Sequence, residues 1–443
     1  MGIHKTFLIF GLAAVTFAQD ITAKADEFVS AFVKQNKFSG TVLIAKEGKV
    51  VFDKAYGMAN YEWSIPNTTD TKFRLGSVTK QFGAAAILKL EEMGKLKTTD
   101  KACDYLPDCP ENWKPIIIHH LLTHTSGIPN FTALKDYGQL KLLPSKYDEQ
   151  YKAVRDLKMD FDPGTKFQYS NTGYILLGQI IEKASGKPWE VFLDEQIFVP
   201  AGMTNTRADN NLVLLPKRAS GYRANGGAPT NASYIDMRIP SVAGALISTT
   251  GDLYKWDRAL ASGKILTESS RTKMWTPEKD NYAYGWGIAK QNGKTEQSHG
   301  GGIDGFSTFI LRVPEDGVLI VVLSNFEDGK TGDVRRGLTD IAYGRPIEVP
   351  KERTEIQLDS ATIEDYPGTY QLSPDFALVI TRQGNQLITQ ATGQGKMPIF
   401  AEAKDTFFPK VMPATIVFTR ENGKVSGLIL KQGGREMPAP KKP

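Results

Sequence analysis

The spacing of apolar residues divides this chain into helical and strand-like stretches. Residues 21–35 place apolar side chains at helical intervals, which predicts an amphipathic helix. Further along, short apolar runs occur in pairs around turn-forming residues, and each pair predicts a β-hairpin. The pairs are 41–45 with 49–52 around Glu47-Gly48, and 306–311 with 318–323 around Glu315-Asp316-Gly317. Both hairpins are apolar enough to lie inside one antiparallel sheet.

The sequence between these hairpins is mostly helical and loop-like. Three helices are expected there, each marked by a terminal signal: 82–93 before Gly94, 174–184 before Gly186, and 252–261 with Thr249 and Asp252 at capping-box spacing. Strands at both ends and helices between them predict an α+β fold. In that fold an antiparallel sheet is flanked by helices and carries a mainly helical subdomain.

The composition changes near residues 344–358, and the pattern beyond is strand-like. Two further hairpins are predicted there: 377–381 with 386–389, and 415–419 with 425–430 around the Asn422-Gly423 turn. We therefore expect a small C-terminal all-β, barrel-like domain that ends in a loose Pro-Lys tail. The predicted division is a signal peptide at 1–19, a main domain at 20–345, a linker at 346–357 and the β domain at 358–443.

The N-terminus has the features of an export signal. Lys5 precedes the apolar run 7–15, and Ala18 ends a small-residue cleavage site before Gln19. The run is shorter than the roughly 20 residues of a membrane span. A periplasmic or secreted protein without stable membrane insertion is predicted. A buried N-terminal helix and a loose myristoylation pattern at Gly2 are the weaker alternatives.

The composition excludes some classes of partner but does not indicate a function. Of the 443 residues, 23% are charged, and the net charge of +5 is spread without the basic stripe that tracks nucleic acid. We therefore expect no nucleic-acid partner. The two cysteines, Cys103 and Cys109, could form a disulfide in an exported protein, and two buried thiols are the equal alternative.

Candidate chemistry begins at Ser77, which precedes an apolar helix and has Lys80 three residues later. At this spacing both side chains lie on one helix face. A lysine whose pKa is lowered by an apolar setting could take the serine proton. The alternative is a helix-capping serine with a surface lysine. A second Ser-x-x-Lys, Ser270 to Lys273, looks like a solvated helix start.

Two more motifs follow in the chain. Tyr169-Ser170-Asn171 follows a turn, and its hydroxyl and amide could relay protons and hold a carbonyl. His299-Gly300-Gly301-Gly302 precedes the apolar strands, where glycines would let a substrate backbone lie along a strand edge. Taken alone, the first is equally a turn with an N-cap asparagine, and the second a flexible loop.

The three motifs in this order resemble those of the serine penicillin-recognising enzymes, which include class C β-lactamases and D-alanyl carboxypeptidases. The resemblance covers residues 35–330. It implies that Ser77 is acylated, that Lys80 and Tyr169 handle protons, and that Asn171, His299, Gly301 and Gly302 bind substrate. Backbone N–H groups of Ser77 and Gly302 would form the oxyanion hole. The resemblance implies no metal or organic cofactor.

Other schemes fit less well. No serine has glycine at both positions of the nucleophile-elbow pattern. The histidines at 119, 120 and 124 lack an acidic partner at ligand spacing, so a buried, hydrogen-bonded His124 is expected rather than a metal site. Where β-lactamases carry lysine and threonine, this chain has His299 and Gly300, which predicts a weak grip on carboxylates. The expected substrates are small molecules or peptides: small esters and D-amino-acid peptides, cell-wall peptides among them, with at most slow β-lactam turnover. The alternative is a receptor that is acylated with little turnover.

Overall fold

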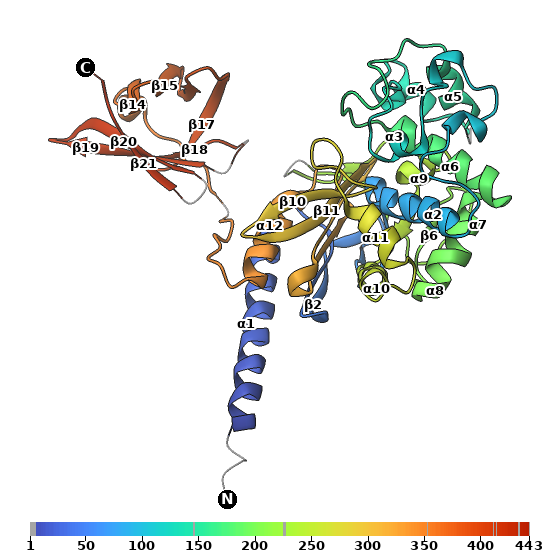
Figure 1. Cartoon of the computed structure of the whole chain (residues 1–443). Helices are drawn as coiled ribbons and strands as arrows, with labels where there is room; N and C mark the ends of the chain where they lie inside the picture. The colour runs from blue at the N-terminus through green and yellow to red at the C-terminus, as the bar shows by residue number, and fades with distance from the viewer. Residues whose placement is uncertain are drawn as a thin grey trace, which may run out of the picture. The chain divides into compact units, whose positions relative to one another are not determined.

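The computed structural model describes residues 6–144, 147–224, 227–351, 353–410, 412, 414–432 and 435–442. The first five residues of the predicted signal peptide, Lys5 among them, lie outside the described part. The chain divides into two compact units, residues 1–349 and 350–443 (Figure 1).

A six-stranded antiparallel sheet forms the centre of the first unit. Its strands lie in the order β10, β11, β12, β13, β1, β2. The hairpins predicted from distant parts of the chain meet where β1 pairs with β13, from Gly40 opposite Ser324 to Ala45 opposite Leu319. The prediction of one shared sheet is confirmed. The strand bounds are β10 Gly287–Gln291, β11 Lys294–Ile303, β12 Phe306–Val313, β13 Val318–Ser324, β1 Gly40–Lys46 and β2 Lys49–Tyr56.

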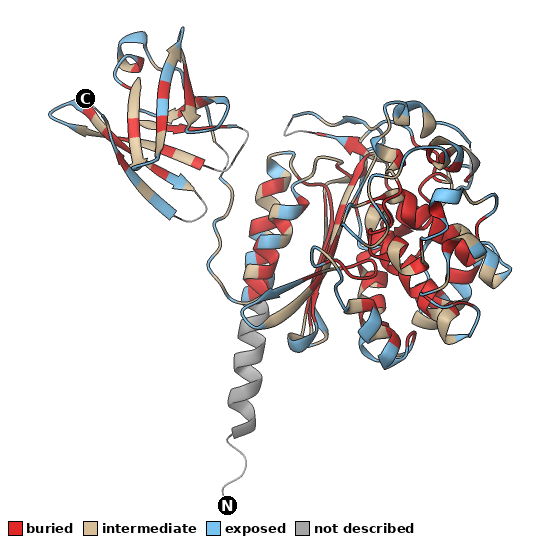
Figure 2. Ribbon diagram, turned by 45° about the horizontal axis from the view of Figure 1, so that its top comes forward, coloured by how far each residue is buried: buried red, intermediate tan, exposed pale blue. Residues whose placement is uncertain are grey.

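The sheet is covered on both faces, which explains its continuous apolar runs. Successive side chains of a strand point to opposite faces. In β1, Val42 and Ile44 pack with helices α1 (Thr6–Lys34) and α12 (Thr331–Ala342), whereas Leu43 and Ala45 belong to the core on the other face. Within the first unit, Figures 1 and 2 show α1 and α12 on one side of the sheet and the other helices of this unit on the opposite side, with buried residues on both sides.

Helix α1 is longer than the predicted segment 21–35. Its described side chains bury one face from Ile21 onward, and that face packs against the sheet. The buried residues of the helix are Ile21, Ala25, Phe28, Val29 and Phe32. In the part of the chain that the structure describes, no helix has both the length and the apolar character needed to cross a membrane.

The helical subdomain lies on the face that carries Ser77. A 3-10 turn, η1 (Gly76–Thr79), leads into α2 (Lys80–Glu92), and α6 (Asn171–Ser185) packs beside it. The predicted ends are confirmed, since Gly94 and Gly186 both have positive φ, which glycine adopts without strain. In α10 (Thr250–Ala261), the Thr249 hydroxyl accepts a hydrogen bond from the Asp252 N–H at 3.2 Å, as the capping signal predicted.

The other elements of this unit are short and connect the ones above. The strands are β3 (Met58–Asn60), β4 (Ile65–Pro66), β5 (Phe73–Arg74), β6 (Arg207–Ala208), β7 (Tyr222–Arg223), β8 (Thr230–Asn231) and β9 (Leu246–Ser248). The helices and turns are η2 (Ala102–Asp104), η3 (Glu111–Trp113), α3 (Ile118–Leu122), η4 (Phe131–Ala133), α4 (Tyr137–Leu140), α5 (Asp148–Arg155), α7 (Trp189–Leu193), η5 (Asp194–Phe198), α8 (Val199–Ala201), α9 (Ser241–Gly244), α11 (Glu268–Trp275) and η6 (Pro314–Asp316). Cys103 and Cys109 form a disulfide, which decides between the two alternatives left open by the sequence.

The second unit is an eight-stranded antiparallel sheet with its strands in sequence order, β14 to β21. An isolated bridge between Tyr370 and Lys441 brings its two edge strands together into a nearly closed barrel around a core of its own. The all-β prediction is confirmed. The element bounds are α13 Ser360–Ile363, β14 Gly368–Ser373, β15 Phe376–Gln383, β16 Gln386–Ala391, β17 Lys396–Ala403, β18 Thr406–Phe408, β19 Ala414–Glu421, β20 Lys424–Gln432 and β21 Arg435–Pro440.

The chain end is not the loose tail that the sequence predicted. Residues 435–440 form β21, which pairs with β20. Two prolines fit because Pro438 and Pro440 alternate with the residues that bond to β20: Lys441 N–H donates to Ser426 O at 2.8 Å. The proline nitrogens therefore face away from β20, so the pairing with β20 loses no donor.

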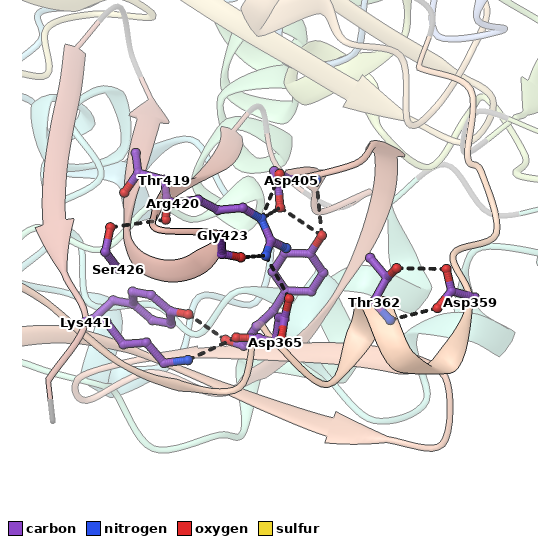
Figure 3. Close-up of polar contacts among 11 residues, drawn as sticks. Asp359, Thr362, Asp365, Asp405, Thr419, Arg420, Gly423, Ser426 and Lys441 are labelled. Carbon is purple, nitrogen blue, oxygen red and sulfur yellow. Dashed lines mark hydrogen bonds and ion pairs between the residues drawn. The ribbon is translucent and has the colours of Figure 1, made fainter.

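A polar network centred on Arg420 and Asp405 joins elements of this barrel, as Figure 3 shows. The Arg420 guanidinium donates to Asp365 at 2.7 Å and to Asp405 at 2.9 Å. The hydrogen bonds to these two carboxylates raise the pKa of Arg420. The Tyr366 hydroxyl also donates to Asp405, at 3.0 Å. These bonds connect strands to the segment before β14 within the second unit.

Candidate active site

Ser77 and Lys80 meet as their spacing predicted. The Lys80 Nζ lies 3.0 Å from the Ser77 Oγ, because the 3-10 turn runs directly into α2 and puts both side chains on one face. The same ammonium group donates to the Asn171 Oδ1 at 2.9 Å and to the Ala243 carbonyl at 2.8 Å. Two segments far from Lys80 in sequence therefore meet its nitrogen beside Ser77.

Burial dominates the electrostatics of Lys80. Its side chain is fully buried, and the three partners named above are uncharged. Loss of hydration lowers the pKa of Lys80 well below its usual value. The apolar setting was expected from its own helix, but the rings of Tyr169 and Tyr174 also enclose the nitrogen, at 4.9 and 5.4 Å from their centroids.

Tyr169 lies next to Ser77, and its phenol is in the neutral form. Burial raises the pKa of Tyr169, and a hydrogen bond with Ser77 partly offsets that rise. The ring also lies beside His124, with the two centroids 4.2 Å apart. A neutral hydroxyl next to Ser77 can donate one proton and accept another, which is what a relay requires.

His299 is buried behind Tyr169 rather than in the open part of the site. Its Nδ1 lies 2.6 Å from the Gly300 carbonyl and must donate to it, so its Nε2 accepts from the Tyr282 hydroxyl at 2.9 Å. Burial, with the nearby charge of Lys80, lowers the pKa of His299 to about 4. The ring is therefore neutral at pH 7, as the sequence suggested for this position.

His124 is buried and hydrogen-bonded, as expected. It is 1% exposed, and its Nδ1 accepts from the Ser170 N–H at 3.2 Å. This bond helps to fix the strand-like segment that carries Tyr169. His119 lies elsewhere, against the Tyr284 hydroxyl at 2.7 Å, so the structure does not bring the three clustered histidines to one point. Within the described ranges, no group of three or more His, Cys, Asp or Glu residues is placed to hold a metal ion.

The glycines of the third motif lie in strand β11 itself, and not in a loop before the strands. β10 pairs with β11 only as far as Ser298, which leaves the edge from His299 to Ile303 uncovered by β10. A Cβ on Gly301 would lie 2.0 Å from the Leu75 carbonyl oxygen, so this glycine allows the strand to approach the serine turn. A Cβ on Gly302 would meet nothing within 4 Å.

The close approach of β11 brings the backbone nitrogen of Gly302 next to the turn that carries Ser77. Gly76 has a φ of 52°, and a Cβ there would lie 2.9 Å from the Gly302 nitrogen. The two segments are thus in direct contact, with Gly302 facing open space. This is the arrangement from which two N–H groups can converge on one oxygen.

Asn171 is the first residue of α6, and its amide is held at both ends. Its Oδ1 accepts from Lys80, while its Nδ2 donates to the Thr132 hydroxyl at 3.1 Å. Its N–H donates to the Asn130 Oδ1, also at 3.1 Å. The family resemblance implies that Asn171 binds substrate, and the structure shows that its amide also contacts Lys80.

A pocket of about 190 Å³ opens beside Ser77. Apolar side chains form most of its wall, and Ser77, Thr132, Asn171 and Asp304 supply polar groups. The lining residues are Gly76, Ser77, Phe131, Thr132, Tyr137, Asn171, Ile235, Ile239, Pro240, Ala243, Gly244, Gly302, Ile303 and Asp304.

Several residues of the site were not identified from sequence. The Ala243 carbonyl is a backbone group and has no residue signature, and Thr132 and Tyr282 occur in stretches without a recognisable motif. The second Ser-x-x-Lys is elsewhere: Ser270 lies near the start of α11, and Lys273 pairs with Glu91 at 2.8 Å. Ser270 is only 8% exposed, so it is less solvated than expected.

Comparison with known proteins identifies the family and the fold. Residues 25–343 match the model of the β-lactamase family, and residues 352–439 match a domain of unknown function (DUF3471). Penicillin-binding protein 4* of Bacillus subtilis is 29% identical over 430 residues, which cover 91% of this chain and 95% of the relative. The octameric penicillin-binding protein homologue from Pyrococcus abyssi has a TM-score of 0.68 at 25% identity, over 94% of this chain and 99% of that one. The D-amino acid amidase of Ochrobactrum anthropi SV3 shares the fold, with a TM-score of 0.62 at 24% identity over 74% of this chain and 98% of its own.

Proposed function

Because the chain belongs to the β-lactamase family, we propose that it is a serine hydrolase that forms an acyl-enzyme on Ser77. The observation that carries this proposal is the buried amine of Lys80 at 3.0 Å from the Ser77 Oγ, at the edge of an open pocket. A hydroxyl needs a base to become a useful nucleophile. A desolvated lysine supplies one, since its neutral form is favoured by burial.

Acylation follows from these positions. Neutral Lys80 takes the Ser77 proton as the Oγ attacks the carbonyl carbon of an ester or amide. The carbonyl oxygen becomes an oxyanion, which the N–H groups of Ser77 and Gly302 stabilise. The C–O or C–N bond then breaks, and the leaving group receives the proton by way of the Tyr169 hydroxyl. Asn171 keeps Lys80 in place during both transfers.

Deacylation uses the same groups in reverse. Lys80 takes a proton from a water molecule as the water oxygen attacks the acyl carbonyl carbon. The bond between that carbon and the Ser77 Oγ then breaks, the acid leaves, and Lys80 returns the proton to the Ser77 Oγ. The alternative function is that of a receptor, which is acylated and releases the acyl group only slowly. The number of acyl groups turned over per chain distinguishes the two.

The substrate class follows from the charge at the third motif. A neutral His299 and a glycine at position 300 offer no permanent cation or hydroxyl to a substrate carboxylate. The pocket wall is mainly apolar, which suits small acyl groups. We propose small esters and D-amino-acid amides or peptides as substrates, with slow β-lactam turnover. One structural neighbour is described as a D-amino acid amidase, and the relatives are described as penicillin-binding proteins.

We also propose that the protein is exported and that the leader is removed after Ala18. The described packing of α1 begins at Ile21, so cleavage there would leave the buried face of the helix intact. The mass of the mature protein, or its N-terminal sequence beginning at Gln19, would test this. A full-length chain in the native host would contradict it.

A substrate panel tests the hydrolase proposal. It includes nitrocefin, p-nitrophenyl butyrate, a D-alanyl-D-alanine peptide and D-alanine amide. Ser77→Ala should remove all turnover and all labelling by a fluorescent penicillin, and Lys80→Ala should lose nearly as much, because the two act as one unit. Ser270→Ala is the matched control and should retain both. Labelling that persists in Ser77→Ala would overturn the proposal. Nitrocefin turnover far above every other substrate would overturn the substrate class alone.

A further inference from the structure

An ion pair stands in the wall of the pocket beside Ser77. Asp304 follows the last residue of β11 and lines the pocket, whereas Lys141, its partner, does not. The two side chains are 10% and 15% exposed, and the Lys141 ammonium bonds directly to the Asp304 Oδ1. The backbone carbonyl of Lys141 accepts from the Asp236 N–H at 2.9 Å, which holds that segment in place. Of the two charged residues, Asp304 is therefore the one that borders the space beside Ser77.

We propose that Asp304 binds a free ammonium group on the acyl part of the substrate, so that the site selects cationic acyl groups over neutral ones and rejects anionic ones. This inference rests on the proposed hydrolase function and names its substrate class more closely. Acyl groups with a free amine, such as an N-terminal D-amino-acid residue, have this chemistry.

The rest of the pocket suits such a group. Phe131, Tyr137, Ile235 and Ile239 provide apolar contacts for a hydrocarbon side chain, while Asp304 lies among them as an acceptor. Burial and the charge of Asp304 raise the pKa of Tyr137 to about 12. The negative charge of Asp304 therefore acts on another residue of the pocket wall. A carboxylate has about four acceptor sites, and the bond from Lys141 to Oδ1 occupies one of them.

The pair also predicts effects of opposite sign. Asp304→Asn removes the acceptor charge and leaves the Lys141 ammonium uncompensated behind the pocket wall. The site should then favour a carboxylate over an ammonium. Lys141→Met removes the competing cation, so that the full charge of Asp304 is available to the substrate. A merely structural role of the pair would make both variants worse for every substrate.

The test uses three matched substrates that share one reporter group. They are the p-nitroanilides of D-phenylalanine, N-acetyl-D-phenylalanine and N-succinyl-D-phenylalanine, which present an ammonium, a neutral amide and a carboxylate. For Asp304→Asn, the ratio of kcat/KM for the ammonium substrate to that for the acetyl substrate should fall about tenfold or more, as for loss of a hydrogen bond to a charged group. For Lys141→Met the ratio should rise. Asp70→Asn is the control, because Asp70 forms an exposed ion pair with Lys217 at 2.7 Å.

A binding measurement separates this inference from the hydrolase proposal. In Ser77→Ala, calorimetric titration with 2-phenylethylammonium should show binding that is lost when Asp304→Asn is added, and 3-phenylpropionate should bind poorly. An unchanged ratio and unchanged binding in the Asp304 variants would overturn the inference while leaving hydrolysis standing. If the wild type cleaved none of the anilides, the hydrolase proposal would fail for this class, and the titration would still decide the role of Asp304.

Discussion

A fully buried ammonium is costly unless its charge is compensated. Lys80 has hydroxyl, amide and carbonyl partners in Ser77, Asn171 and Ala243, and the rings of Tyr169 and Tyr174 enclose it. These uncharged partners orient the nitrogen but do not compensate for the hydration that the ammonium loses on burial. The folded protein thereby shifts the amine toward its neutral form, which is the form that can accept the Ser77 proton.

The pH dependence of the reaction should report this shift. Lys80 must lose a proton to act as base, so kcat/KM should rise with pH through a pKa well below the usual lysine value and then level off. The pKa of Tyr169 is raised, so no fall is expected at moderately alkaline pH. Measured with p-nitrophenyl butyrate, Tyr169→Phe should lower the plateau and keep the rising limb. Lys80→Arg should be inactive at every pH. A rising limb near pH 10 in the wild type would contradict this account.

The lowered pKa of His299 predicts a pH dependence of the free energy of unfolding rather than of the reaction rate. Its pKa falls from 6.5 to about 4 on folding, so the unfolded chain binds more protons between these values. Stability is then fully present above pH 6.5 and is lost as the pH falls toward 4, by about 3 kcal/mol for this group. His299→Gln should lose less stability between pH 7 and pH 4.5. Denaturant midpoints from tryptophan fluorescence measure it, since all six tryptophans precede residue 350. An equal loss in both proteins would refute the assignment.

The elements differ in how far sequence could predict them. The hairpins at 41–52 and 306–323 were predicted because apolar runs around a glycine turn have few other solutions. Segment 299–303 was read as preceding the strands, because three glycines carry no strand propensity; it extends β11 through its pairing with β12. β21 was not predicted either, because prolines disfavour a strand unless their nitrogens face away from the pairing partner. That orientation depends on the fold and cannot be read from the sequence. The three motifs indicated Ser77, Lys80 and Tyr169 as candidates, whereas partners such as the Ala243 carbonyl depend on the fold.

The contact between β11 and the serine turn gives a prediction at this scale. Gly301→Ala would put a Cβ 2.0 Å from the Leu75 carbonyl oxygen and 2.4 Å from the Thr308 hydroxyl, so the strand must move away. Overpacking of this kind costs about 1–3 kcal/mol, and a displacement of about 1 Å costs on the order of 100-fold in rate. Gly302→Ala is the matched control for folding, because its Cβ meets nothing within 4 Å and stability should change by about 0.5 kcal/mol or less. Denaturation midpoints and ester kinetics measure both. Near-normal activity in Gly301→Ala would contradict the role of this contact.

At the scale of the whole molecule, the chain holds separate cores. Two large cores lie on the two faces of the central sheet within residues 1–349, and another is enclosed by the barrel within residues 350–443. The barrel also has its own polar network around Arg420 (Figure 3). The catalytic candidates belong to the first unit, and none of the three motifs recurs in the second. Each unit has what a domain needs to fold alone.

Truncation tests this independence. A chain that ends at Val349 keeps Ser77, Lys80, Tyr169 and the pocket, so it should fold and hydrolyse p-nitrophenyl butyrate at a rate within a few-fold of the full chain. Its tryptophan-detected unfolding should match that of the intact protein within about 0.5 kcal/mol, the usual range for a change that touches no core. Residues 350–443 alone should give a cooperative β-sheet unfolding transition by circular dichroism. A preference for larger peptide substrates that differs between the truncated and full chains would assign the barrel a part in substrate selection. A truncated chain that folds but no longer reacts with the ester would show that the site requires the second unit.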